Sequence, residues 1–121
     1  LATDAPLLPH QCERLAQRAG LGVARTGGAG EHSSGDLFIA FATGNRGLAT
    51  GDGTAGRAFT RRLEALDDVW ISPLFWAAVE STEEAIVNAL VAAETMAGAD
   101  GHIAHRLPHD RLVEVWRAHR G

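Results

Sequence analysis

Apolar residues recur at helical spacing near the start of the chain. The first such set is Leu8, Cys12, Leu15 and Ala19. Residues spaced by three and four lie on one face of a helix, so we predict a helix over 10–19. Pro9 suits its first turn, where a missing N–H costs little, and Gly20 is the predicted stop. Residues 21–25 are then predicted to be a short extended run.

Two further helical patterns occupy the second half of the chain. The longer one contains Val79, Ile86, Leu90, Ala93 and Ala97. It predicts a helix over 83–97 that Gly98 ends, and its many alanines indicate packing on more than one face. Ser72-Pro73 predicts a separate helix through Glu80, and Ser81 with Glu84 resembles a capping box for the longer one.

The last pattern predicts a helix over 110–119, opened by Pro108. Its expected buried stripe consists of Leu112, Val115 and Trp116. The run 101–109 before it contains Gly101 and Pro108 and is therefore expected to be a connector between helices.

Strand patterns are fewer. Residues 37–43 are apolar throughout, which is typical of a strand that is covered on both faces in a layered α/β protein. Residues 1–4 resemble the tail of a strand, with 4–6 as its exit turn. Residues 44–56 are rich in glycine and cannot form a core. Residues 57–68 permit a helical turn, and 69–71 permit a short strand.

Composition limits the class of protein. The 121 residues are 45% apolar, which suits one domain with a modest core, so we treat 1–121 as a single unit. All basic residues are arginine, the net charge is −4, and no basic block predicts a nucleic-acid partner. No run approaches the ~20 apolar residues of a membrane helix. The lone Cys12 excludes an internal disulfide and is interpreted as a buried or half-buried thiol.

The most promising chemistry lies in the loop 26–36, which leads into the strand at 37. Its last residues include Glu31, His32, Ser33, Ser34 and Asp36. On an extended backbone Ser34 and Asp36 share a face, so the carboxylate can orient the hydroxyl for proton transfer. The residues leave open a turn cap, a His32 base, or an N-terminal amine acting as base. The loop matches neither a P-loop nor a dinucleotide fingerprint.

Two other groups have competing interpretations. His102, His105 and His109 have a spacing that zinc accepts, but a polar connector is the simpler interpretation because the segment is not one helix. Glu83 and Glu84 are expected to be solvated acids of a first helical turn. Glu94 has two open interpretations, as a solvated residue or as a buried carboxylate paired with an arginine, Arg25 or Arg46.

Four segments together resemble a known family. They are ATDAPLLPHQ, ARTGGAGEHSSGDLFIAFATGN, STEEAIVNALVAAETMAGADGH and LPHDRL. They resemble the C-terminal small subunit of the L-aminopeptidase/D-esterase family, which includes the β-peptidyl aminopeptidases. The resemblance covers most of the chain in order and is weakest over 57–71.

The resemblance implies an autoprocessed N-terminal-nucleophile hydrolase with a four-layer α/β/β/α sandwich, completed by a larger N-terminal subunit. A Ser or Thr about five residues before Leu1 would be the nucleophile, at roughly 3.3 Å of strand per residue. Ser34 and Asp36 match the family's Ser-Gly-acid motif and would tune that nucleophile and its amine. Many relatives carry Glu where this chain has Asp36. Thr3 aligns with the family's A-T-D strand end and is not the expected nucleophile.

The implied activity is the release of N-terminal residues from short peptides, amides or esters, without a cofactor or a metal. The two-chain unit is expected to form a homo-oligomer in the cytoplasm, with a periplasmic or secreted location left open. One alternative is a hydrolase of linear amide oligomers on the same scaffold. An acyl-transferring relative, of the ornithine acetyltransferase type, is disfavoured by the A-T-D-A-P start and the S-G-D motif. An alternative of another class is a non-catalytic metal- or ligand-binding module that uses the histidines.

Overall fold

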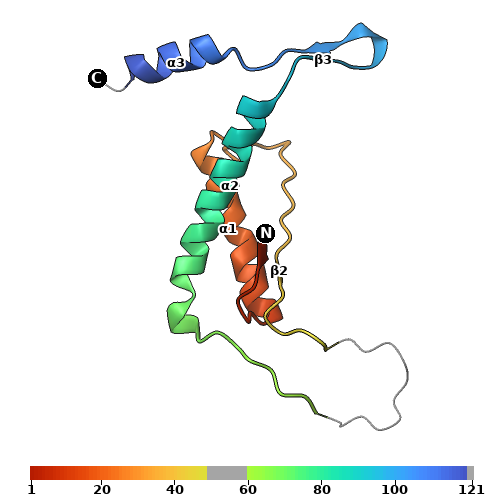
Figure 1. Ribbon diagram of the computed structural model, residues 1–121, viewed down its shortest axis with the longest axis vertical. Coiled ribbons are helices and arrows are strands. Elements are labelled where there is room, and N and C mark those ends of the chain that lie inside the picture. The colour runs from red at the N-terminus through yellow and green to blue at the C-terminus, as the bar shows by residue number, and fades with distance from the viewer. Residues whose placement is uncertain (49–59, 120–121) are drawn as a thin grey trace.

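The computed structural model describes residues 1–48 and 60–119. Its helices and strands follow one another as β1 (Ala2–Thr3), α1 (Pro9–Arg25), β2 (Phe41–Ala42), α2 (Ser72–Ala92), β3 (Met96–Ala97), β4 (Ile103–Ala104) and α3 (His109–Ala118). Short 3-10 turns cover Asp68–Trp70 and Ala99–Gly101. Within the described residues three α-helices accompany two small sheets, which makes this an α/β structure (Figure 1).

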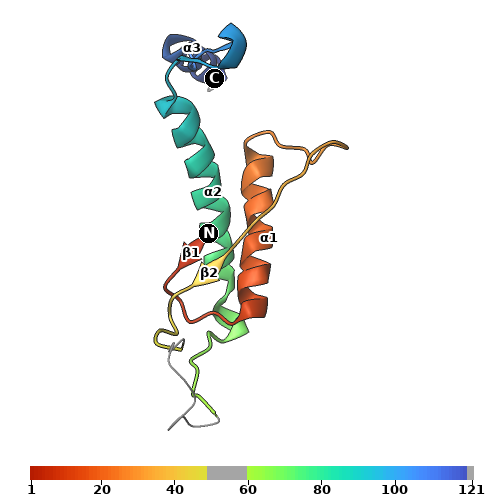
Figure 2. The same ribbon diagram turned by 90° about the vertical axis from the view of Figure 1, so that its right-hand side faces the viewer.

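The first half is a β-α-β unit with parallel strands. Ala2 pairs with Phe41 and Thr3 with Ala42, and α1 connects the two strands. Figure 2 shows both strands in front of the helix pair α1 and α2, so the helices cover one face of the sheet. The predicted strand end over 1–4 is confirmed by β1, which covers Ala2–Thr3.

The core lies between this sheet and the two helices. Its buried members include Leu7, Leu15 and Ala78. The partly buried residues packed on them come from α1, β2 and α2, from the chain on either side of β1, and from the segment before α2. The predicted apolar face of the first helix is confirmed, because Leu15 and Ala19 are buried and Cys12 is half-buried. The first turn of α1, the sheet and the start of α2 therefore form one packed body.

Helix α1 is longer than the glycine signal predicts. It continues past Gly20 to Arg25, so the predicted stop and the extended run over 21–25 are wrong. The reason is tertiary. A Cβ on Gly22 would lie 2.6 Å from the Val79 carbonyl oxygen and 2.6 Å from the Thr82 Cβ, so this glycine permits a close approach of α2. Packing against α2 stabilises residues that glycine propensity alone would release from the helix.

Helix α2 begins at Ser72 as predicted, but it runs without a break to Ala92. The second helix start at Ser81 is therefore wrong, because the Ser81 and Thr82 hydroxyls donate to the Ala78 carbonyl inside the helix, at 3.3 and 2.7 Å. The predicted end near Ala97 is also wrong, because Met96–Ala97 forms β3. The helical spacing of apolar residues continues through Ala93 and Ala97, so the hydrophobic pattern does not mark the end of α2 at Ala92.

The strand predicted over 37–43 is confirmed only at Phe41–Ala42. The expectation that both of its faces are covered is wrong for this chain, since Leu37 is 94% and Ile39 78% exposed. The short strand considered over 69–71 is a 3-10 turn, begun by the Asp67 carboxylate, which accepts from the Val69 N–H at 3.1 Å. Of the ambiguous stretch 57–68, residues 57–59 lie outside the described residues, and 60–67 form no helix or strand.

The last third extends away from the helix pair. Strands β3 and β4 form an antiparallel hairpin, and α3 follows at the far end of α2 (Figure 1). The predicted last helix is confirmed by α3, but its buried stripe is wrong, because Leu112, Val115 and Trp116 are exposed. No helix among the described residues has the length and apolar character needed to cross a membrane.

Candidate active site

The loop that leaves α1 is shaped by its glycines. At the end of the helix, the N–H groups of Thr26 and Gly28 both donate to the Val23 carbonyl, at 3.1 and 3.0 Å. Gly27 has φ 102° and Gly30 has φ 63°, values that residues with a Cβ adopt rarely. These two glycines let the chain reverse and return along the sheet toward β2.

Ser34 and Asp36 meet just after this turn. The Ser34 Oγ donates to the Asp36 Oδ2 at 3.1 Å, and both side chains are exposed. The Ser34 N–H donates to the Glu31 carbonyl at 2.8 Å, which fixes the backbone where the hydroxyl begins. The structure therefore brings together the two residues that sequence reasoning selected, and their catalytic role stays a prediction.

A shallow hollow of about 350 Å³ opens beside this pair. Its lining consists of Val23, Gly27, Gly28, Ala29, Gly30, Glu31, Ser33, Ser34 and Asp36. Two acidic residues and two serines are therefore among the residues around one open space. His32 is not part of the lining, and within the described residues no hydrogen bond joins it to Ser34 or Asp36, so the His32 base has no support in the geometry.

The hydrogen-bonded pairing of β1 with β2, extended backwards along both segments, leads to Ser34 and Asp36. The Leu1 amino group donates to the Ile39 carbonyl at 2.7 Å, and the Phe41 N–H donates to the Leu1 carbonyl at 3.1 Å. These bonds place Leu1 opposite Ala40, which is one residue of parallel pairing beyond β1 itself. The direction of β1, followed backwards, runs along 34–40 toward the Ser34–Asp36 pair.

The other candidate residues do not assemble. Within residues 1–48 and 60–119 no three histidine, cysteine or acidic side chains lie together as a metal site would require. The His109 Nε2, at the first residue of α3, lies 2.9 Å from the Val91 carbonyl of α2, so this imidazole joins the two helices. The segment 101–109, predicted to be a plain connector, contains strand β4. Glu94 is exposed, so its interpretation as a buried carboxylate is wrong. Arg25 instead pairs with Glu83, at 3.0 Å, in the middle of α2.

Sequence reasoning missed a buried glutamine that ties the start of α1 to the approach of α2. Gln11 is only 2% exposed. Its Oε1 accepts from the Leu8 N–H at 3.0 Å, and its Nε2 donates to the Leu66 carbonyl at 2.8 Å and to Asp68 Oδ1 at 2.7 Å. The hydrogen bond from the Gln11 amide to the Asp68 carboxylate, together with the positive charge of Arg14, holds the pKa of Asp68 below its ordinary value. In the sequence, the buried role of Gln11 is indicated only by its position as a polar residue beside the apolar face of the first helix.

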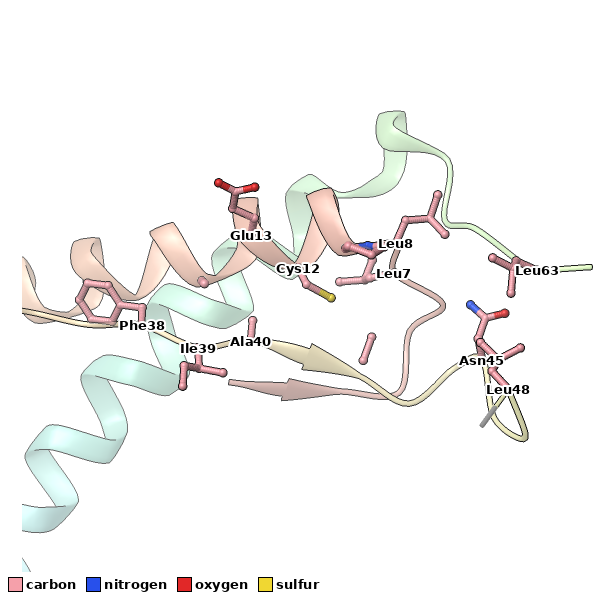
Figure 3. Close-up of a pocket in the computed structure, with 13 residues that line it drawn as sticks. Leu7, Leu8, Cys12, Glu13, Phe38, Ile39, Ala40, Asn45, Leu48 and Leu63 are labelled. Atoms are coloured by element: carbon pink, nitrogen blue, oxygen red, sulfur yellow. The ribbon is translucent and has the colours of Figure 1, made fainter. Parts of the chain in front are cut away.

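A second, larger hollow of about 660 Å³ lies between α1 and β2 and is mostly apolar (Figure 3). Figure 3 shows the Cys12 side chain pointing from α1 toward the strands and the Glu13 carboxylate pointing away from them, with Phe38 and Ile39 on the segment that leads into β2. No cluster of catalytic groups accompanies this hollow. The sequence predicted a half-buried thiol at Cys12, and the structure confirms that interpretation.

Comparison with known proteins shows the family of this chain. A family model, that of Peptidase family S58, matches residues 1–104. The β-peptidyl aminopeptidase BapA of Sphingosinicella microcystinivorans is 42% identical over 120 residues, which are 99% of this chain and 29% of that protein. The chain therefore spans less than a third of the curated relative.

Solved structures are similar over nearly the whole chain. A Burkholderia sp. β-aminopeptidase matches with a TM-score of 0.85 and 50% identity, over 96% of this chain and 33% of that one. The L-aminopeptidase D-Ala-esterase/amidase of Ochrobactrum anthropi, described as a variant of the Ntn hydrolase fold, matches with a TM-score of 0.81 and 39% identity, over 96% and 31%. Because the family model matches residues 1–104, which are most of its length, the chain belongs to peptidase family S58.

Proposed function

We propose that this chain is the C-terminal small subunit of a self-cleaved aminopeptidase that releases N-terminal residues from short peptides, amides or esters. The observation that carries the proposal is the Ser34–Asp36 hydrogen bond at the point toward which the β1 ladder runs. Membership of the peptidase family and the printed names of the relatives support the same class of reaction.

The register of the sheet supports an upstream nucleophile. Each β1 residue pairs with the residue 39 positions further along. A preceding strand that kept this register for about five residues would end opposite Gly35, between Ser34 and Asp36. A Ser or Thr there, heading the small subunit after self-cleavage, would have its amine and hydroxyl beside the pair.

The chemistry follows from the hydrogen-bond direction. Because Ser34 donates its proton to Asp36, the lone pairs of its Oγ are left to accept from a neighbouring amine or hydroxyl. The nucleophile's hydroxyl attacks the substrate carbonyl, its own α-amine takes the proton, and the Asp36 charge stabilises the resulting ammonium. The ammonium then gives this proton to the leaving amine or alcohol as its bond to the carbonyl carbon breaks, which leaves the acyl-enzyme. A water molecule attacks the acyl carbon while the α-amine takes its proton, and transfer of that proton to the nucleophile's oxygen releases the acid and restores the hydroxyl.

The fold supports a larger partner from the same precursor. A two-stranded sheet is marginal on its own, and the face turned away from the helices exposes Leu37 and Ile39. A second sheet packed on that face would bury them and give the four-layer α/β/β/α sandwich. The two-chain unit is proposed to assemble further into a homo-oligomer.

The test starts with the complete precursor. We expect intact mass and N-terminal sequencing to show two chains, the smaller one beginning with Ser or Thr a few residues before Leu1. Release of amine from aminoacyl and β-aminoacyl amides should fall by about 10²-fold or more in Ser34→Ala and Asp36→Ala. Ser33→Ala is the matched control, because Ser33 lines the same hollow without the bond to Asp36. An uncleaved, single-chain active enzyme, or full activity in both site variants, would contradict the proposal.

A further inference from the structure

The side of α1 and α2 that faces away from the sheet carries aromatic and charged groups that the proposed reaction does not use. We call Arg18, Leu21, Phe75, Trp76 and Glu80 the outer patch. The Arg18 guanidinium stacks 4.1 Å from the centre of the Phe75 ring. Beside it, a hollow of about 230 Å³ is lined by Arg18, Leu21, Ser72, Phe75, Trp76 and Val79. Trp76 is 60% exposed although it is the largest side chain of the patch.

Within the described residues the charged side chains of the outer patch form no ion pairs, whereas the neighbouring arginines do. Arg14 pairs with Asp68 at 3.1 Å and Arg25 with Glu83 at 3.0 Å. Arg18 donates only to the Arg14 carbonyl of its own helix, at 3.3 Å, and no carboxylate of the described residues pairs with it. Glu80, one helical turn after Trp76, likewise has no basic partner in the part of the chain that the structure describes.

The outer patch lies where a second sheet cannot reach it. Leu74 and Ala78 contact the core on the sheet side of α2, while Trp76 and Glu80 are offset to the opposite side of the helix. Figure 2 shows β1 and β2 on one side of the helix pair, and the offset of Trp76 and Glu80 from Leu74 and Ala78 places the outer patch away from the sheet. Completion of the sandwich covers the exposed face of β2 and leaves the outer patch in solvent.

We propose that the outer patch is a two-fold interface between copies of this protein. An interface of this symmetry must be complementary to itself. A surface with an arginine lacking an acid and an acid lacking a cation, on either side of an exposed indole, meets that condition. Arg18 of one copy pairs with Glu80 of the second copy, and the two Trp76 indoles pack into the facing hollows. Trp and Arg are also the residue types that dominate binding energy at interfaces.

This inference rests on the proposed homo-oligomer and names its surface. The test uses the complete purified protein and measures molar mass by sedimentation velocity at micromolar concentration. Arg18→Glu and Glu80→Arg should each lower the mass by a factor of about two, because either change places like charges across the two-fold axis. The double variant R18E/E80R restores the opposite charges and should restore the mass. Glu94→Arg, at an exposed acid just past the end of α2 and away from the outer patch, is the matched control and should leave the mass unchanged.

Each result decides the inference separately from the proposed function. Within the described residues the Glu80 side chain makes no hydrogen bond or ion pair that Glu80→Arg would remove, so dissociation of that variant with an unchanged Tm reports the interface and not misfolding. A wild type with the mass of one two-chain unit, unchanged mass in both single variants, or a double variant that stays dissociated would overturn the proposal. Aminopeptidase activity absent from every protein, including the wild type, would count against the proposed reaction and leave the mass result standing.

Discussion

Gly22→Ala is expected to destabilise the protein, although alanine is the better helix former. The residue lies inside α1 at the closest approach of α2. A Cβ placed there would be 2.6 Å from the Val79 carbonyl oxygen and 2.6 Å from the Thr82 Cβ. The first of these is a backbone atom, and it cannot move away by a change of rotamer, so the helices must separate.

The two opposing terms set the magnitude. Replacing glycine by alanine within a helix is worth about 0.5–1 kcal/mol of stability. Overpacking of this kind costs about 1–3 kcal/mol. We therefore expect the free energy of unfolding to fall by about 1–2 kcal/mol in Gly22→Ala.

The same helix contains its own control. A Cβ on Gly20 would meet only the Phe38 ring, at 3.5 Å, which is ordinary van der Waals contact. Gly20→Ala should therefore raise stability by about 0.5–1 kcal/mol. Urea unfolding of the complete protein, followed by circular dichroism, measures both variants. If Gly22→Ala were as stable as Gly20→Ala, the close helix contact would not exist as described.

Three further changes test other parts of the structure. Gln11→Leu should lower the free energy of unfolding by about 1–3 kcal/mol, because the Leu66 carbonyl and its neighbours lose a buried partner; an unchanged urea midpoint would contradict this. The pKa of Asp68 is lowered in the folded state, so its stabilising contribution is present above its ordinary value of 3.8 and is lost as the pH falls through the lower folded pKa. Asp68→Asn should therefore flatten the Tm against pH in that acid range, and a curve parallel to wild type would refute the linkage. Asp36→Asn keeps the size of the side chain but removes the charge beside Ser34, so kcat/KM should drop by about 10²-fold with the Tm unchanged; loss of Tm with it would indicate a structural role.

Short-range sequence signals, such as proline positions and helical periodicity, predicted the starts of the helices. Pro9 and Ser72-Pro73 mark the starts of α1 and α2, because proline favours the first turn of a helix. The helical spacing of Leu112, Val115 and Trp116 predicts α3, because this periodicity is set within about one turn. The Ser34–Asp36 contact was also predictable, since alternation along an extended backbone places residues two apart on the same face.

Long-range contacts decided the rest. Gly20 and Gly22 would end an isolated helix, but the close approach of α2 keeps α1 helical to Arg25. The role of Gln11 depends on Leu66 and Asp68, more than fifty residues away, and no local pattern records such partners.

The sequence by itself determined the chemistry that is available, namely a hydroxyl and a carboxylate two residues apart after a glycine turn, and the helix starts that support it. Only the tertiary structure decided where that pair lies relative to β1, which sides of α2 are covered, and which arginines have acidic partners. The physical reason is range. Backbone geometry and side-chain periodicity are set by neighbours within a few residues, whereas strand register, close helix approach and charge pairing depend on segments that meet only when the chain folds.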